Sequence, residues 1–351
     1  MSVPHRQPEV AVWDSCPIVV LQAHLRINNV SLDWFRAESA SPLADFQAMQ
    51  IKNSFSKLGL GGLVIEIHSP ESLPFLREKR FLPFQTDAAV PDIHWNYQII
   101  EMDPQVSVKR DPQNDLRPAS VKHLGNGNAL LAAPQVRKRL EQAGNHLQWL
   151  TIEIHQGAVT ILDFKENRAD MFFCREFADE LGDHGIGPAM LAPFLADFDA
   201  CLLHASAVVR KGRTTVFLAP DEGGKTTAAR LAPEGGIILS DDRVLVRRVA
   251  EEFRVYGTPW GLHMDGKLQA PLAGLFLLKK ARNFSLVPLT TRALVSYLWE
   301  EFENISAILP GPLKKKAFDL VCAMAAQIPI WKMSFSKDYI DWDALDKKLT
   351  G

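Results

Sequence analysis

Hydrophobic positions along the chain alternate between helical and strand spacing, and this predicts a mixed α/β protein. Over 43–58 the apolar residues recur at helical spacing, so a helix is expected there, ended by a glycine cluster. A short apolar run over 63–67 predicts a buried strand. His68 follows directly, and a capping or surface position is the expected role for it.

The middle of the chain has the pattern of a β-rich region. Strand-like runs cover 93–100, 147–155 and 158–164, and the last two are separated by a two-residue Gln-Gly turn that predicts a hairpin. Asp, Pro, Asn and Gln concentrate over 103–118, which predicts a linker, and another turn is expected at 125–128.

From residue 189 onward the predicted elements are short and closely spaced. They are a helix over 189–195, strands over 202–209 and 214–218, a helix over 225–231 and a strand over 237–239. A loop with two glycines precedes the second helix, and two aspartates follow the third strand. Strand, loop, helix, strand and acidic pair is the order that a nucleotide-binding α/β core requires.

The C-terminal third completes this core. Strands are expected over 272–278 and 330–335, and helices over 291–302, 315–326 and 341–349. Trp299, Trp331 and Trp342 fall within or beside these elements, where packing is their expected role.

Composition narrows the class of partner. The 351 residues carry 39 basic and 41 acidic side chains, a formal charge of -2, so neither nucleic acid nor a membrane is expected as a partner. The basic pair Arg247-Arg248 and the lysine run 314–316 are expected at solvated ends of elements. The most apolar stretch, 186–209, is broken by prolines and aspartates and is not expected to span a bilayer.

Cysteine usage and the N-terminus favour a cytoplasmic protein. The four cysteines are far apart and predict neither a disulfide framework nor a zinc site, while Cys201 and Cys322 lie in apolar runs typical of a core. Residues 1–12 lack the apolar segment of a signal peptide. The sequence leaves open whether the chain forms a homo-oligomer.

The segment after the 214–218 strand fits the phosphate-loop pattern G-x-x-x-x-G-K-[ST], except that alanine holds the first position. Its residues are Ala219, Pro220, Asp221, Glu222, Gly223, Gly224, Lys225 and Thr226, followed by Thr227. In such a loop backbone amides bind phosphate oxygens, the lysine adds a charge on the β and γ phosphates, and the hydroxyl binds Mg²⁺. Asp221 and Glu222 oppose an anionic ligand unless they point outward.

Two further features supply candidate catalytic groups. Asp241-Asp242 ends the next strand, where one carboxylate can hold Mg²⁺ and its neighbour can accept the proton of an attacking hydroxyl. His204 lies in an apolar strand ahead of the loop. A core histidine is the ordinary interpretation, but the strand–turn–strand order could also bring His204 beside the phosphates.

Together, the segment 203–208, the phosphate loop and the segment 239–242 resemble the C-terminal kinase domain of HPr kinase/phosphorylase and its relatives. That family shares its fold with phosphoenolpyruvate carboxykinase. The resemblance implies an α/β phosphate-loop core of this type, with a β-rich preceding region and a small N-terminal α/β module. It covers about residues 201–262 closely and the remainder loosely.

The resemblance also implies roles for individual residues. His204 matches the family's catalytic histidine, Lys225 its phosphate-loop lysine and Thr226 its Mg²⁺-binding hydroxyl. Asp242 matches the proton acceptor, and Asp241 the carboxylate on the metal side. The family's glycine-rich signature and its metal-binding glutamate after this core are absent from the sequence, so neither phosphorylase activity nor HPr as substrate is implied.

Residues 256–260 resemble a Gly-x-Pro-Trp element of HPr kinase relatives. There Trp260 would either form a wall of the substrate site or pack in a structural turn. His263 and Asp265, which follow this element, are not assigned a role.

The resulting hypothesis is a cytoplasmic kinase that uses ATP and Mg²⁺. Its acceptor would be a hydroxyl, on a serine of a protein or peptide or on a small molecule. The alternatives are a catalytically weak or inactive module that binds nucleotide or peptide, and a carboxykinase-like enzyme. The expected division is a small N-terminal module over 1–85, a β-rich region over 86–195 and the kinase core over 196–351.

Overall fold

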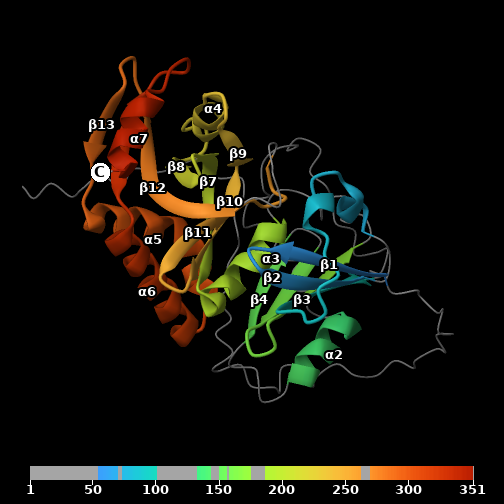
Figure 1. The fold of residues 1–351 in the computed structure, drawn as a ribbon. Coiled ribbons are helices and arrows are strands. Elements are labelled where there is room, and N and C mark those ends of the chain that lie inside the picture. Colours follow the sequence, from blue (N-terminus) through green and yellow to red (C-terminus); the bar gives the residue numbers. More distant parts are fainter. Residues whose placement is uncertain are drawn as a thin grey trace, which may run out of the picture.

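The fold is described here from a computed structural model. It describes residues 54–69, 73–100, 133–143, 150–155, 158–174, 186–261 and 269–350. The predicted linker at 103–118 and turn at 125–128 lie outside these ranges. Two β-sheets and the helices packed on them form a mixed α/β protein (Figure 1).

The first sheet has six strands in the order β1-β2-β3-β6-β5-β4. Their bounds are β1 Ser54–Leu60, β2 Leu63–Ser69, β3 Ile93–Ile100, β4 Leu150–His155, β5 Ala158–Asp163 and β6 Arg168–Cys174. β3 lies parallel to both β2 and β6, and the remaining pairs are antiparallel. β1 and β2 therefore share one sheet with strands from the region beyond residue 86.

Alternation along these strands gives the sheet two different faces. One face is apolar and contributes residues such as Leu58, Ile65 and Trp95 to a buried core. Helix α2, Pro134–Ala143, packs on part of the other face. There the buried Arg139 donates to two buried carboxylates, Asp163 at 2.8 Å and Asp170 at 2.5 Å, which leaves each charge with a partner.

The second sheet has eight strands, ordered β11-β10-β7-β8-β12-β14-β13 with β9 also paired to β7. Their bounds are β7 Ala200–Arg210, β8 Arg213–Leu218, β9 Ile237–Ser240, β10 Arg243–Val249, β11 Glu252–Tyr256, β12 Gln269–Lys280, β13 Ser285–Pro288 and β14 Ile330–Phe335. The first part of β7 pairs with β10, and the later part pairs with β8 and β9. Because β11 also pairs with β12, five of the strands close into a ring.

Helices cover both faces of this second sheet. The α-helices are α3 Ile186–Leu195, α4 Lys225–Arg230, α5 Thr291–Ile308, α6 Gly311–Gln327 and α7 Trp342–Thr350, and the short 3₁₀ helices are η3 Pro74–Arg77, η4 Leu82–Phe84 and η8 Ala196–Phe198. α5 and α6 share a core with one face, and α4 and α7 share a core with the other (Figure 1). In the part of the chain that the structure describes, no helix combines the length and apolarity needed to cross a membrane.

One core joins the two sheets. It combines apolar residues of β1, β2, β3 and β6 with α3, Leu245 of β10 and Leu313 of α6. At this junction the Arg247 guanidinium donates to the carbonyl of Gly61 at 2.8 Å, so one member of the predicted solvated basic pair instead connects the sheets.

The predicted helix over 43–58 is wrong in its described part, because residues from Ser54 onward form strand β1. The glycine cluster that was expected to end a helix instead makes the turn of the β1–β2 hairpin, with Gly61 and Gly62 at positive φ. Pairing with β2 and burial of Leu58 and Leu60 override the local helical spacing. His68 lies within β2 and does not follow it.

Candidate functional site

The loop between β8 and α4 is shaped by its two glycines. Gly224, at φ 102°, starts α4 in a conformation that side-chain-bearing residues rarely adopt. A Cβ on Gly223 would lie 2.4 Å from the Cβ of Ala219, so the loop closes only without a side chain at this position. The predicted strand–loop–helix order is confirmed, with the helix over Lys225–Arg230.

Lys225 is held inside this loop. Its side chain is 7% exposed, and its ammonium donates to the carbonyls of Ala219 at 2.8 Å and Pro220 at 3.0 Å. Burial lowers the pKa of Lys225, and the carboxylates of Asp221, Asp242 and, on α5, Glu301 act in the opposite direction. A buried lysine beside carboxylates is an arrangement found at functional sites as well as in structural networks.

Strand register places His204 beside the acidic pair. Arg243, the first residue of β10, pairs with His204 on β7, and the amide of Ala205 donates to the carbonyl of Asp242 at 2.9 Å. This pairing brings His204 Nε2 to 3.1 Å from Asp242 Oδ1. The predicted proximity of His204 to the loop and acidic pair therefore follows from the antiparallel β7–β10 ladder.

Asp221 points into the site. Its Oδ1 atom lies 3.3 Å from His204 Nε2 and 3.9 Å from Lys225 Nζ, although the side chain remains 42% exposed. One acidic residue of the loop is thus close to where an anion contacting Lys225 would lie. Glu222 is exposed and adopts a left-handed backbone conformation at φ 57°.

The remaining predicted residues surround this centre. The Thr226 hydroxyl is 3.4 Å from the carbonyl of the buried Asp241, and Ser206 donates to the carbonyl of Lys225 at 2.7 Å. These contacts attach the start of α4 to β7 and to the acidic turn. Thr227 lies one residue further along α4 and is partly buried.

Sequence reasoning missed two charged residues of the site. Arg243 approaches Asp242 Oδ1 at 3.8 Å, and Glu301 acts electrostatically on Lys225 from α5. Arg243 directly follows the acidic pair, which was a usable signal. Glu301 lies 76 positions beyond Lys225 (301 − 225), and no local pattern connects them.

Trp260 does not form a wall of this site. It is 1% exposed and belongs to the core that joins the two sheets, where Gly187 of α3 lies against its indole. Thr258 of the same element donates to the carbonyl of Arg243 at 2.8 Å. Residues 256–260 therefore contact β10 through Thr258 and pack in the core through Trp260, which agrees with the structural interpretation of this element.

A separate cleft of about 340 Å³ lies between the β7–β8 turn and α7. It is lined by Arg210, Lys211 and Arg213 among others, but Arg210 and Lys211 are both paired with Asp346. None of the site residues described above lines this cleft.

Comparisons with known proteins give limited information. A family model described as "SynChlorMet cassette protein ScmC" matches residues 194–350, which is less than half of the chain. One similar solved structure is the Hpr(Ser) kinase/phosphatase from Coxiella burnetii, at 12% identity and a TM-score of 0.23, covering 42% of this chain and 92% of that one. A TM-score of 0.23 does not establish a shared fold. No curated protein matches.

Proposed function

We propose that the chain is an ATP-dependent phosphotransferase that delivers the γ-phosphoryl group to a hydroxyl. The proposal rests on one observation: a buried lysine, a histidine and two aspartates from β7, the loop and the β9–β10 turn converge within hydrogen-bond or ion-pair distance. The motif resemblance in the sequence supports the same activity.

The residues present suit a magnesium nucleotide. Lys225 already binds oxygen atoms, the loop carbonyls, and phosphate oxygens of ATP would replace them. The Thr226 hydroxyl, which lies 3.4 Å from the main-chain carbonyl of Asp241, and the Asp241 carboxylate would hold Mg²⁺, a cation that prefers oxygen ligands. Mg²⁺ would neutralise charge on the β and γ phosphates.

Asp242 is the proposed proton acceptor. A general base must reach the proton that it removes. Asp242 lies beside His204 of β7, next to the candidate phosphate loop. His204, at 3.1 Å, would orient the Asp242 carboxylate or share the proton. Serine of a protein or peptide, or the hydroxyl of a small molecule, is the proposed acceptor class.

Titration calorimetry of Mg·ATP against three variants tests these roles. Lys225→Ala should abolish ATP binding. Asp242→Asn should bind ATP with little change in Kd, but its turnover rate in an ADP-release assay should fall at least 100-fold. Lys211→Ala, at an exposed turn where the lysine pairs with Asp346, is the matched control and should bind as wild type does.

A nucleotide- or peptide-binding module without catalysis is the second candidate, and the inward orientation of Asp221 favours it. Absence of binding to wild type at millimolar nucleotide would support the peptide-binding form of this candidate. An Asp242→Asn variant that changes neither nucleotide binding nor turnover would support the nucleotide-binding form. Equal loss of binding and turnover in Asp242→Asn would remove its assigned role as a base.

A further inference from the structure

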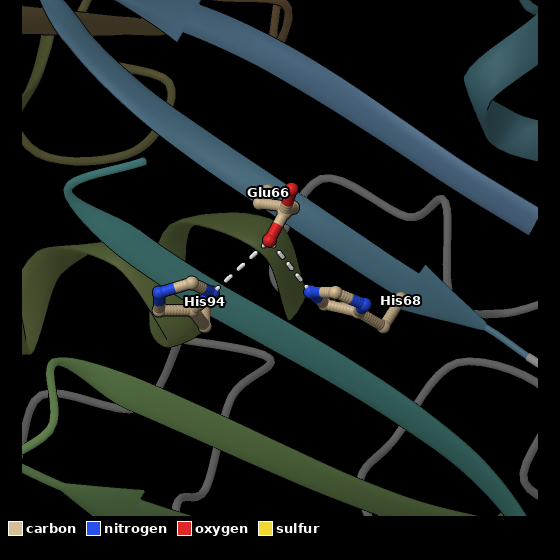
Figure 2. Close-up of side chains that lie close together, drawn as sticks. All are labelled: Glu66, His68 and His94. Atoms are coloured by element: carbon tan, nitrogen blue, oxygen red, sulfur yellow. Dashed lines mark hydrogen bonds and ion pairs between the residues drawn. The ribbon is translucent and has the colours of Figure 1, made fainter. Parts of the chain in front are cut away.

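A second cluster of chemically capable side chains lies on the six-stranded sheet. Glu66 and His68 are two residues apart on β2, so both point to the same face, and His94 on β3 pairs in register with Glu66 (Figure 2). This face is opposite the core that joins the two sheets, and all three side chains are partly exposed to solvent.

Both histidine side chains approach one carboxylate oxygen of Glu66. Glu66 Oε2 lies 2.9 Å from His68 Nε2 and 3.4 Å from His94 Nδ1, and Figure 2 shows both imidazoles directed at this carboxylate. The three potential ligand atoms all lie within 4.8 Å of one another. Among the described residues, no other trio of histidine, cysteine or carboxylate ligand atoms converges in this way.

The two separations measured from Glu66 are close to the dimensions of a metal site. Zn²⁺ binds imidazole nitrogen and carboxylate oxygen at about 2.0–2.2 Å, so the ligand atoms of a tetrahedral site lie roughly 3.3–3.5 Å apart. The Glu66–His94 separation already has this value. The Glu66–His68 pair would open by about half an ångström, which a side-chain rotation supplies.

A supporting residue fixes the carboxylate. Lys57 Nζ lies 3.6 Å from the other oxygen, Oε1, and donates to the carbonyls of Ala88 and Ala89 at 3.1 and 3.2 Å. Oε2 is therefore the oxygen directed at the two imidazoles, and Glu66 would bind a metal through one oxygen. Outer residues that orient a ligand are a regular part of metal centres.

We propose that Glu66, His68 and His94 bind a first-row transition-metal dication of the Zn²⁺ type, with a fourth coordination position open to solvent. Imidazole and carboxylate donors favour such ions over Mg²⁺ or Ca²⁺, which take oxygen ligands. The site lies on a different sheet from the proposed phosphotransfer centre and does not depend on that assignment.

The ordinary interpretation is a pair of histidines hydrogen-bonded to a surface glutamate. Metal binding distinguishes the two, because a hydrogen-bonded cluster has no reason to hold Zn²⁺ or Co²⁺ with one-to-one stoichiometry. The other candidate site also contains a histidine and two aspartates, so the experiment must separate the two locations.

The experiment is calorimetric titration of Zn²⁺ into chelator-treated full-length protein in excess Mg²⁺, repeated with Co²⁺ to record its visible absorption. Wild type should bind one equivalent at this site, with the intense bands of tetrahedral Co²⁺. His68→Gln and His94→Gln should each weaken that binding at least 30-fold and remove the bands. His204→Gln is the matched control and should retain both.

Circular dichroism of each variant checks that it is folded. Because the substituted side chains are partly exposed, no folding defect is expected. Lys57→Met adds a second measurement: it should retain the stoichiometry and change the affinity by less than 10-fold. Binding that survives both His68→Gln and His94→Gln, or that disappears in His204→Gln, would overturn the proposal, as would wild type that binds neither ion.

Discussion

At the scale of single residues, Asp221 has the most unusual position in the candidate site. A phosphate loop holds anions, yet this carboxylate lies 3.9 Å from the lysine that would contact them. It also lies 3.3 Å from His204, so it occupies the space beside both side chains that a phosphate would contact. The sequence raised the question of its orientation, and the conformation of the β8–α4 loop directs it inward.

Replacing Asp221 with asparagine should therefore strengthen Mg·ATP binding. Removing a like charge near the phosphates is worth about 1 kcal/mol once solvent screening is allowed for, which is roughly a five-fold lower Kd. Calorimetry measures this change directly. Glu222→Gln, at the exposed neighbouring position, should change the Kd less than two-fold, and weaker binding in Asp221→Asn would show that the carboxylate helps to hold the ligand.

At the scale of elements, helix α3 illustrates how one glycine permits close packing. A Cβ on Gly187 would lie 2.6 Å from the indole nitrogen of Trp260, so the helix approaches that ring only because the side chain is missing. Trp260 is fully buried, and Phe194 of the same helix lies in the same core. The contact connects α3 to residues 256–260, which also contact β10 through Thr258.

Gly187→Ala should lower the free energy of unfolding by about 1–3 kcal/mol, because overpacking forces the indole or the helix to move. Thermal or urea denaturation followed by circular dichroism measures the loss. Gly311→Ala is the matched control, since a Cβ there meets nothing within 4 Å, and helix propensity should make that change neutral or slightly stabilising. Equal stability of the two variants would contradict the packing argument.

At the scale of the whole molecule, the two sheets depend on each other. Their shared core contains Leu245 of β10 and Leu313 of α6 together with the apolar face of the first sheet, and Arg247 bonds to Gly61 across the junction. Isolating either sheet would expose this apolar surface to water. Strand β10, which pairs with β7 at His204 of the candidate site, therefore also contacts the first sheet.

Cooperative unfolding is the expected consequence. In urea, tryptophan fluorescence and far-ultraviolet circular dichroism should give one coincident transition. Trp95→Phe removes a reporter in the first sheet and Trp342→Phe one in helix α7, which packs on the second sheet, and each variant should still show one transition. Leu245→Ala should lower stability by about 2–5 kcal/mol without splitting that transition. Two separate transitions would show that the sheets fold as independent units.

Much of the second sheet could be predicted from the sequence because its elements have clear local patterns. The 330–335 strand agrees at both ends, and the strands and helix around Lys225 agree within two residues. Strands β10, β11 and β13 were not assigned. β10 and β11 mix charged and apolar residues and β13 has only four residues, so long-range pairing makes them strands.

The sequence by itself determined the order of the elements around the candidate phosphate loop, the composition of that loop and the identity of the acidic pair, because each depends on neighbours within a few positions. Tertiary structure decided that Ser54–Leu60 is a strand, that Asp221 points inward and that Trp260 is buried. It also brought His94 beside Glu66, 28 positions earlier (94 − 66). Register between distant strands sets the β1–β2 pairing and the Glu66–His94 contact, whereas loop conformation sets Asp221 and core packing sets Trp260. No local periodicity encodes contacts between segments that meet only after folding.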